Sequence, residues 1–558
     1  MLTNRFAFNR HYHRPQFSRW GFAIIIIALL MALPILVIAS FVFQPNNENW
    51  QHLVDNLLGE YVKNSLILML GVSAGVLSMG VITAWLTSMC DFPGRRLFSW
   101  TLLLPLAIPA YIIAYTYTGL LDFSGPVQTQ LRDWFGWHYG DYWFPEVRSM
   151  GGAIAMLSLV LYPYVYMLAR AAFLEQSICV LDVSRTLGNS PFKSFYKVAL
   201  PLARPAIVTG LTLALMETLA DYGTVQYFGV NTFTTGIFRT WFGMGDSVTA
   251  AKLSAVLLGF VFVLIMLERW SRSRARFHHT SNKYSAIRRY PLQGWRAALA
   301  VLACLLPVLF GFILPALQLL YWTFTTAEET MDSSFFKLVG HSLLLASLTA
   351  VIAVMIALLL SYGKRLLKSP VINLSVRIAS MGYAIPGTVI AVGVLLPFAW
   401  IDNTVDSWMR EHFNISTGLI LSGTLFALIF AYLVRFLSVS IQAIDAGLEK
   451  IRSSMDDAGR SLGLSPIRIL RDIHFPLMKG TVLTALLLVF VDVLKELPAT
   501  LILRPFNFNT LAVRAYEMAA DERLADAGAP ALMIVVVGLL PILLLSRAIS
   551  HARAGDKH

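Results

Sequence analysis

Apolar runs of about 20 residues or more recur along this chain, from Ile24 to Leu545. A run of that length can cross the hydrocarbon core of a membrane as a helix. Unpaired backbone groups are too costly in lipid, so such runs must form helices or a closed barrel. Because they are continuous rather than alternating, they indicate helices. The charged fraction is 14%, against about 25% in soluble domains. The sequence therefore predicts an all-α polytopic membrane protein.

About twelve transmembrane helices are expected, and charge sets their orientation. Basic residues gather before the first run and in a few short loops, which the positive-inside rule places in the cytoplasm together with both termini. The first run is too long for a signal-peptide core and is interpreted as a retained anchor. The predicted spans are 20–43, 64–89, 98–121, 150–173, 206–228, 249–269, 295–323, 340–363, 371–399, 417–440, 480–502 and 529–547.

The two halves of the chain repeat each other. Ala107-Ile108-Pro109-Ala110 returns as Ala384-Ile385-Pro386-Gly387, at an offset of 277 residues. A near-constant offset over several spans predicts two parallel six-helix repeats related by an axis along the membrane normal. The expected domains are a tail over 1–19, a first permease domain over 20–269, a basic cytoplasmic linker over 270–294, a second permease domain over 295–550 and a tail over 551–558.

Two polar segments interrupt the apolar pattern, one in each half, at an offset of 275 residues. They lie in cytoplasmic loops expected at 174–205 and 441–479. Each carries a glycine, expected to end a short helix in the left-handed conformation, and then a Ser-Pro pair that starts a second short helix. A further proline is expected to open the next span. We interpret each segment as a small helix that docks on a soluble partner. An amphipathic interfacial helix is the alternative, and lipid contact gives no reason for two copies with one spacing.

This pattern resembles the permease subunits of ABC importers that use a periplasmic binding protein. Their signature is Glu-Ala-Ala, three residues, glycine, nine residues and Ile-x-Leu-Pro. Asp replaces Glu in both copies here, and Phe475 replaces leucine, so charge or bulk is kept. The resemblance implies the type I importer fold and contact with an ATPase subunit. The residues that would make this contact are Asp182, Gly188, Ser190, Pro191, Leu200, Pro201, Asp457, Gly463, Ser465, Pro466, Phe475 and Pro476.

A narrower resemblance concerns the substrate. The stretches 217–229 and 495–506, and the fusion of two domains in one chain, look like permeases of the ferric-iron importer family. This similarity implies a multi-pass protein of the bacterial inner membrane that moves ferric iron. It also implies two copies of an ATPase subunit that binds ATP and Mg²⁺, a periplasmic ferric-binding protein, and no cofactor on this chain. Thiamine and phosphonate permeases of related fused build keep those substrates open.

Acidic residues occur inside two predicted spans. Glu217 and Asp221 are four residues apart, which predicts one helix face, and Asp492 and Glu496 occupy the equivalent places beside Lys495. A carboxylate at the bilayer centre costs about 2.5–3.5 kcal/mol. The four acids are therefore candidates for the path of a highly charged cation, because oxygen ligands suit a hard ion. The alternative is that Lys495 and backbone groups pair with them and lock the two halves together.

Two arginines, Arg239 and Arg514, also match at the offset of 275, near the outer ends of these helices. They are candidate contacts for the binding protein, with lipid headgroups as the alternative.

Several motifs are absent from the sequence. It contains no Gly-x-x-x-x-Gly-Lys-Ser/Thr loop and no His-Glu-x-x-His pair. The net charge of +12 comes from short loops, so we expect lipid and no nucleic acid as a partner. We expect a transport subunit, not an enzyme, that draws energy from a separate ATPase. A gradient-driven carrier is the alternative and leaves the twin polar segments unexplained.

Overall fold

The computed structural model describes residues 19–138, 140–175, 191–273 and 289–551, which are almost entirely helical. The first half contains α1 (Arg19–Ser40), η1 (Phe41–Phe43), α2 (Glu48–Asn56), α3 (Leu58–Met89), β1 (Cys90–Asp91), α4 (Arg95–Thr101), η2 (Leu104–Ala107), α5 (Ala110–Leu121), α6 (Pro126–Phe135), α7 (Met150–Glu175), α9 (Pro191–Ser194), η3 (Phe195–Ala199), α10 (Leu200–Ala220), α11 (Gly223–Tyr227), α12 (Phe233–Phe238), η4 (Arg239–Gly243) and α13 (Ser247–Ser273).

The second half follows the same order. It contains β2 (Tyr290–Pro291), α14 (Trp295–Val308), η5 (Leu309–Ile313), α15 (Leu314–Thr330), α16 (Ser333–Leu367), α17 (Pro370–Ala379), η6 (Gly382–Ala384), α18 (Gly387–Phe413), α19 (Leu425–Glu449), α20 (Ser453–Ser461), α21 (Pro466–Ile469), η7 (Leu470–His474), α22 (Phe475–Leu477), α23 (Lys479–Leu494), α24 (Pro498–Leu503), α25 (Leu511–Ala520) and α26 (Gly528–His551). The two short strands, β1 and β2, pair in parallel.

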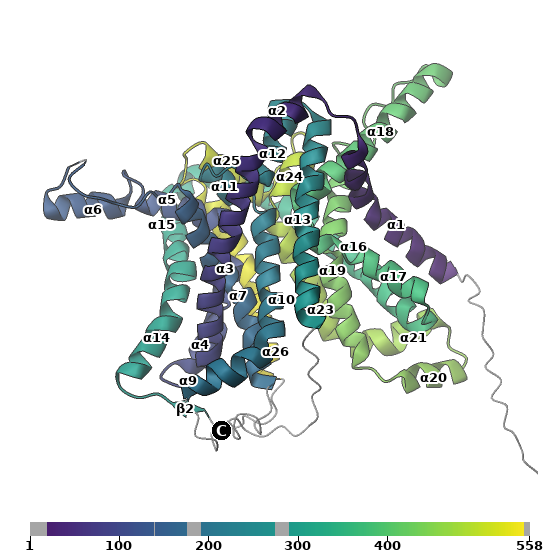
Figure 1. Ribbon diagram of the computed structural model, residues 1–558. Helices are drawn as coiled ribbons and strands as arrows, with labels where there is room; N and C mark the ends of the chain where they lie inside the picture. The colour runs from purple at the N-terminus through teal and green to yellow at the C-terminus, as the bar shows by residue number, and fades with distance from the viewer. Residues whose placement is uncertain (1–18, 139, 176–190, 274–288, 552–558) are drawn as a thin grey trace, which may run out of the picture.

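The long helices stand side by side in one bundle (Figure 1). Among the described residues, nine helices are long and apolar enough to span a membrane, or up to eleven if each of two bent pairs counts as one span. Each of the twelve predicted spans overlaps a helix of the structure. The face that carries α20 and α21 is called the lower face here, and the face that carries α2, α12 and α25 is called the upper face (Figure 1).

The first helix of each half packs on the other half. α1 lies mainly against α17 and α18, whereas α14 and α15 run along α3 and α5. Glycines allow this approach: a Cβ on Gly393 would lie 2.6 Å from the carbonyl oxygen of Pro34 in α1. Small residues at such crossings let backbones approach closely. The exchange of first helices ties the halves into one unit.

Four predicted spans were wrong in their continuity. The span over 371–399 is divided among α17, η6 and α18. The span over 98–121 bends by 91° between η2 and α5, where Pro109 caps α5 in an extended conformation. The span over 206–228 stops at Ala220, and that over 480–502 stops at Leu494. The last two breaks fall at the same place in each repeat, and both lie beside the candidate acids.

The second polar segment has the predicted local structure. Gly463 follows α20 with φ of 77°, as a left-handed cap requires. Ser465 is the N-cap of α21 and accepts a hydrogen bond from the backbone N–H of Arg468, and Pro466 begins the helix. Pro476 does not open the next span as predicted. It lies inside α22, and the helix over 466–477 meets α23 at 84°.

The first polar segment is only partly covered. Asp182, Gly188 and Ser190 lie outside the described residues. Pro191 begins α9, and Leu200 and Pro201 form the first turn of α10, as predicted for Pro201.

Candidate functional site

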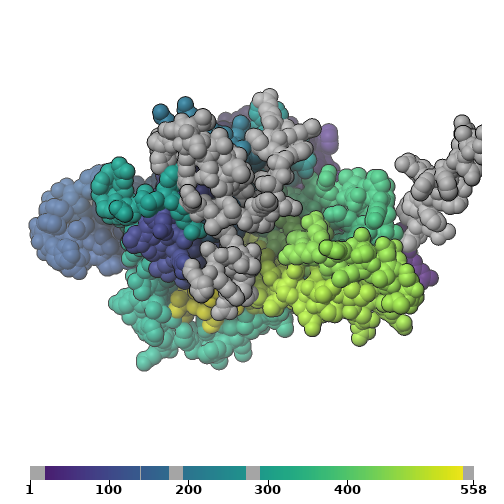
Figure 2. Space-filling view, turned by 90° about the horizontal axis from the view of Figure 1, so that it is seen from below, coloured from purple at the N-terminus to yellow at the C-terminus, as the bar shows by residue number. Residues whose placement is uncertain are grey.

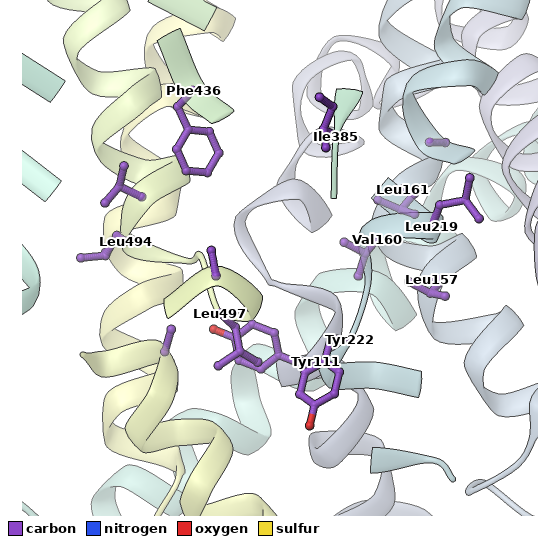
Figure 3. Packing of buried hydrophobic residues seen from close by; sticks show 14 of the residues in the cluster. Tyr111, Leu157, Val160, Leu161, Leu219, Tyr222, Ile385, Phe436, Leu494 and Leu497 are labelled. Carbon is purple, nitrogen blue, oxygen red and sulfur yellow. The ribbon is translucent and has the colours of Figure 1, made fainter. Parts of the chain in front are cut away.

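The four acids predicted from the sequence line one cavity of about 120 Å³ between the halves. Its walls come from α5, α7 and α10 of the first half and from α19, α23 and α24 of the second. Figure 3 shows the apolar part of these walls, where Leu497 of the second half meets Tyr111 and Tyr222 of the first. Arg435, Lys495, Tyr164 and Tyr383 also line the cavity. The structure therefore brings together residues as far apart in the sequence as Leu106 and Pro498, which are separated by 392 positions.

Two of the acids cap short helices. Asp221 accepts hydrogen bonds from the Thr224 hydroxyl at 2.9 Å and the Val225 backbone N–H at 3.1 Å, at the start of α11. Glu496 accepts in the same way from the backbone N–H groups of Ala499 and Thr500, at the start of α24. These bonds satisfy N–H groups that a helix start leaves without partners. The prediction that Glu217 and Asp221 share one helix face is wrong, because the capping carboxylate lies after the break.

The other two acids lie within the long helices. Asp492 of α23 pairs with Lys495, with 2.8 Å between Oδ1 and Nζ. Among the described residues, Glu217 of α10 has one ion-pair partner within 4 Å, since its Oε2 lies 3.9 Å from Nη2 of Arg435. Arg435 also donates to Oε1 of Glu496 at 3.0 Å. The arginine thus stands between an acid of each half, and we call Arg435 with Glu217 and Glu496 the Arg435 bridge.

The Arg435 bridge was missed in the sequence, although a signal was present. Arg435 is the lone charge of the apolar span predicted over 417–440, and it lies near the middle of α19. A charge at such a place is costly and marks a functional position. Its repeat equivalent at the offset of 275 is Val160, and that of Lys495 is Ala220. The cations of the cavity thus come from the second half only, whereas both halves supply acids.

The cavity holds no obvious metal-chelating site. Within the part of the chain that the structure describes, no group of three or more His, Cys, Asp and Glu side chains is arranged to hold a metal ion. Asp221 and Glu496 accept hydrogen bonds from helix starts, and Asp492 forms an ion pair with Lys495.

On the upper face, Arg239 and Arg514 lie on η4 and α25. Arg239 is exposed and donates to the side-chain oxygen of Asn231 at 2.9 Å, whereas Arg514 is half-buried. Their contact with a binding protein stays a prediction. The same face carries a second link between the halves: Arg148 donates to both carboxylate oxygens of Glu522, at 2.7 and 2.8 Å.

On the lower face, the second polar segment is anchored to α16. Arg365 donates to Asp456 at 2.7 Å and to the carbonyl oxygens of Leu448 and Ile451. The buried His474 ring contacts the other oxygen of Asp456. Burial raises the pKa of Asp456, but the hydrogen bonds from Arg365 and His474 outweigh it and hold the pKa of this carboxyl below its usual value. Asp457, the residue that matches the signature, is exposed.

The segment around α20 and α21 forms a projecting part of the lower surface (lime in Figure 2). Gly463, Ser465, Pro466, Phe475 and Pro476 are all exposed there. The arrangement leaves the turn between the two helices open to a partner.

The twin segments, the repeated helices and the central cavity define a transport permease built from two homologous halves. The family model for the binding-protein-dependent transport system inner membrane component matches residues 12–276 and again residues 350–552. The chain belongs to this family and is a multi-pass membrane protein.

Some relatives match nearly the whole chain, and others match about one third of it. The chain is 27% identical to the Fe(3+)-transport system permease protein FbpB 2 of Haemophilus influenzae over 96% of this chain and 99% of that protein. It is 23% identical to the ferric transport system permease protein FbpB of Actinobacillus pleuropneumoniae over 95% of this chain and 78% of that protein. The molybdenum transport system permease protein ModB of Escherichia coli is 26% identical over 36% of this chain and 88% of its own length.

Proposed function

We propose that this chain is the permease of an ATP-driven importer that moves ferric iron across the bacterial inner membrane. Two copies of a cytoplasmic ATPase subunit hydrolyse ATP with Mg²⁺, and a periplasmic binding protein delivers the iron. The chain crosses the membrane twelve times, with the lower face and both termini in the cytoplasm. Support comes from the similarity to an Fe(3+) permease along nearly the whole chain.

The docking of the ATPase rests on the exposed polar segment of the lower face. Leu462, which follows α20, is 80% exposed there, and Ile467 of α21 is 63% exposed. Neither residue belongs to one of the long apolar helices. Apolar side chains rimmed by polar ones mark interaction sites. The first permease half supplies the second docking site through the segment that contains Asp182 and Pro191.

The preferred cargo follows from the charges of the cavity. Four carboxylates face two cationic side chains there, so the balance favours a cation. An oxyanion is the second candidate, because Arg435 and Lys495 line the same cavity and a one-repeat relative carries molybdenum in its name.

Reconstitution of the complex in liposomes tests this function. Ferric-loaded binding protein is expected to stimulate ATP hydrolysis and uptake of radiolabelled iron, whereas binding proteins for molybdate, thiamine or phosphonate leave both at the basal rate. Stimulation by one of those proteins instead would replace iron as the cargo.

A docking variant tests the energy source separately. Ile467→Asp is expected to reduce co-purification of the ATPase subunit at least tenfold. Phe506→Asp is the matched control, since Phe506 is 95% exposed but follows α24, away from the lower face. Iron uptake that persists without any ATPase subunit would refute an ATP-driven importer.

A further inference from the structure

The Arg435 bridge is the only ion pair between the halves that lies inside the cavity, among the described residues. The side chain of Arg435 is 10% exposed, that of Glu496 is 2% exposed and that of Glu217 is 27% exposed. Glu496 and Arg435 both belong to the second half, so their 3.0 Å contact does not depend on how the halves are arranged. The contact with Glu217 does, because Glu217 is carried by α10 of the first half.

Glu217 is also the acid of the cavity with the weakest local ties. Asp221 and Glu496 receive hydrogen bonds from the helix starts that they cap, and Asp492 pairs with Lys495 on its own helix. For Glu217, the described residues provide one ion-pair partner within 4 Å, Arg435 at 3.9 Å, whereas Lys495 acts on it from farther away. A separation of that size is easily lost when two helices move, whereas the bonds of the other three acids move with their own helices.

We propose that Arg435 is a tethered counter-ion that gates the path and occupies Glu217 until the halves move apart. This role rests on the proposed transport function. With the bridge closed, the guanidinium neutralises Glu217 and leaves a passing cation no free carboxylate at this position. When the halves separate, Arg435 stays with Glu496 and its capping network, and Glu217 becomes available to the cation. Arg435 thus makes the availability of the Glu217 carboxylate depend on the separation of the two halves.

The guanidinium of Arg435 and the carboxylate of Glu496 pack directly against Gly387. A Cβ added to Gly387 would lie 2.3 Å from Nη1 of Arg435 and 2.6 Å from Oε1 of Glu496. The first half has Ala110 at the equivalent of Gly387 and Val160 at the equivalent of Arg435. The half that carries the guanidinium therefore also carries the glycine that makes room for it.

The test measures ATP hydrolysis by the reconstituted complex with neither binding protein nor iron. Glu217→Gln breaks the link between the halves without stranding a buried charge, because Arg435 keeps Glu496. It is expected to raise basal hydrolysis at least threefold and to lower iron uptake at least tenfold. Arg435→Gln is expected to raise basal hydrolysis as well, and the double variant no further than Arg435→Gln alone.

Arg410→Gln is the matched control, since Arg410 forms a 2.7 Å ion pair with Asp406 on one exposed stretch of α18. It is expected to change basal hydrolysis less than twofold. Basal hydrolysis that is unchanged in Glu217→Gln, or effects that multiply in the double variant, would overturn the proposal. A structural role alone would lower basal hydrolysis and uptake together.

A second measurement needs no ATPase subunit. Thermal unfolding of the purified chain in detergent is compared for Glu217→Gln, Arg435→Gln and the double variant. Losses of stability that simply add in the double variant would show that Arg435 and Glu217 do not interact and would overturn the proposal. Basal hydrolysis and thermal unfolding are both measured without iron. If the cargo proves to be another ion, basal ATP hydrolysis and the non-additivity of the two variants in thermal unfolding still test the proposed role of Arg435. If the wild-type complex fails to take up iron, that result refutes the proposed cargo alone.

Discussion

Replacing Gly387 with alanine tests how tightly the Arg435 bridge is packed. The added Cβ would lie 2.3 Å from Nη1 of Arg435, whereas ordinary contact begins at 3.4 Å. Glu496 is held by α24, so the guanidinium must move by roughly 1 Å and lose its hydrogen bond. A hydrogen bond to a charged group contributes about 1.5–3 kcal/mol, and alanine returns up to about 1 kcal/mol of helix propensity. The variant should therefore lose about 0.5–3 kcal/mol of stability.

The assay is unfolding of the purified chain in detergent, followed by tryptophan fluorescence. Gly340→Ala in α16 is the control, because no atom lies within 4 Å of its added Cβ. It should gain about 0.5–1 kcal/mol. Ala110→Gly, at the equivalent place of the first half, should lose no more than about 1 kcal/mol. A Gly387→Ala protein that is as stable as the wild type, with both controls behaving as expected, would refute the geometry of the bridge.

Three further predictions concern the two faces and the cavity. Asp456→Asn removes the carboxylate that Arg365 and His474 share. Breaking a buried pair costs about 3–5 kcal/mol; we expect about 3 kcal/mol, because Arg365 keeps two carbonyl partners, and protease cleavage within 450–480 should rise. The hydrogen bond from Arg148 lowers the pKa of Glu522 below its usual 4.5. The stabilisation from this pair is thus complete above pH of about 4.5 and is lost as pH falls through the lower folded-state pKa. For so exposed a pair it amounts to at most about 1 kcal/mol, and Glu522→Gln should abolish that part of the pH dependence of unfolding. Asp221→Ala removes the cap of α11 and should cost about 1 kcal/mol in the same assay, whereas Asp221→Asn should cost less than half of that.

The helices and the repeat could be predicted because they follow from local pattern. A continuous apolar run in lipid must form a helix, because its backbone groups find no water to pair with. The glycine cap at Gly463 and the helix start at Ser465-Pro466 depend on only a few neighbouring residues. The breaks after Ala220 and Leu494 were harder, because the apolar run continues through them. They depend on Asp221 and Glu496, whose carboxylates replace the backbone partners that a continuous helix would supply.

The site was half predictable for a related reason. Glu217, Asp221, Asp492 and Glu496 stand out because acids are rare in spans, and the common offset indicates that they gather. The Arg435 bridge depends on the packing of α19 against α23 and α24 and on the approach of Arg435 to Glu217 of α10. No single stretch of sequence encodes these contacts. Arg435 has no charged equivalent in the first half, so a search guided by the repeat passes over it.

The absence of that equivalent follows from the fusion of the two halves. A permease made of two identical one-repeat chains would place the same residue on both sides of its twofold axis. An arginine at this position would then face a second arginine across the same cavity, and each would repel the other in a medium of low dielectric constant. The Escherichia coli relative, which covers 36% of this chain with 88% of its own length, has the size of one repeat. In the fused chain the halves can differ, so Val160 and Ala110 fill one wall while Arg435 and Gly387 form the other. A single guanidinium can then serve acids from both halves, which makes one bridge, rather than two opposed charges, the central contact of the path.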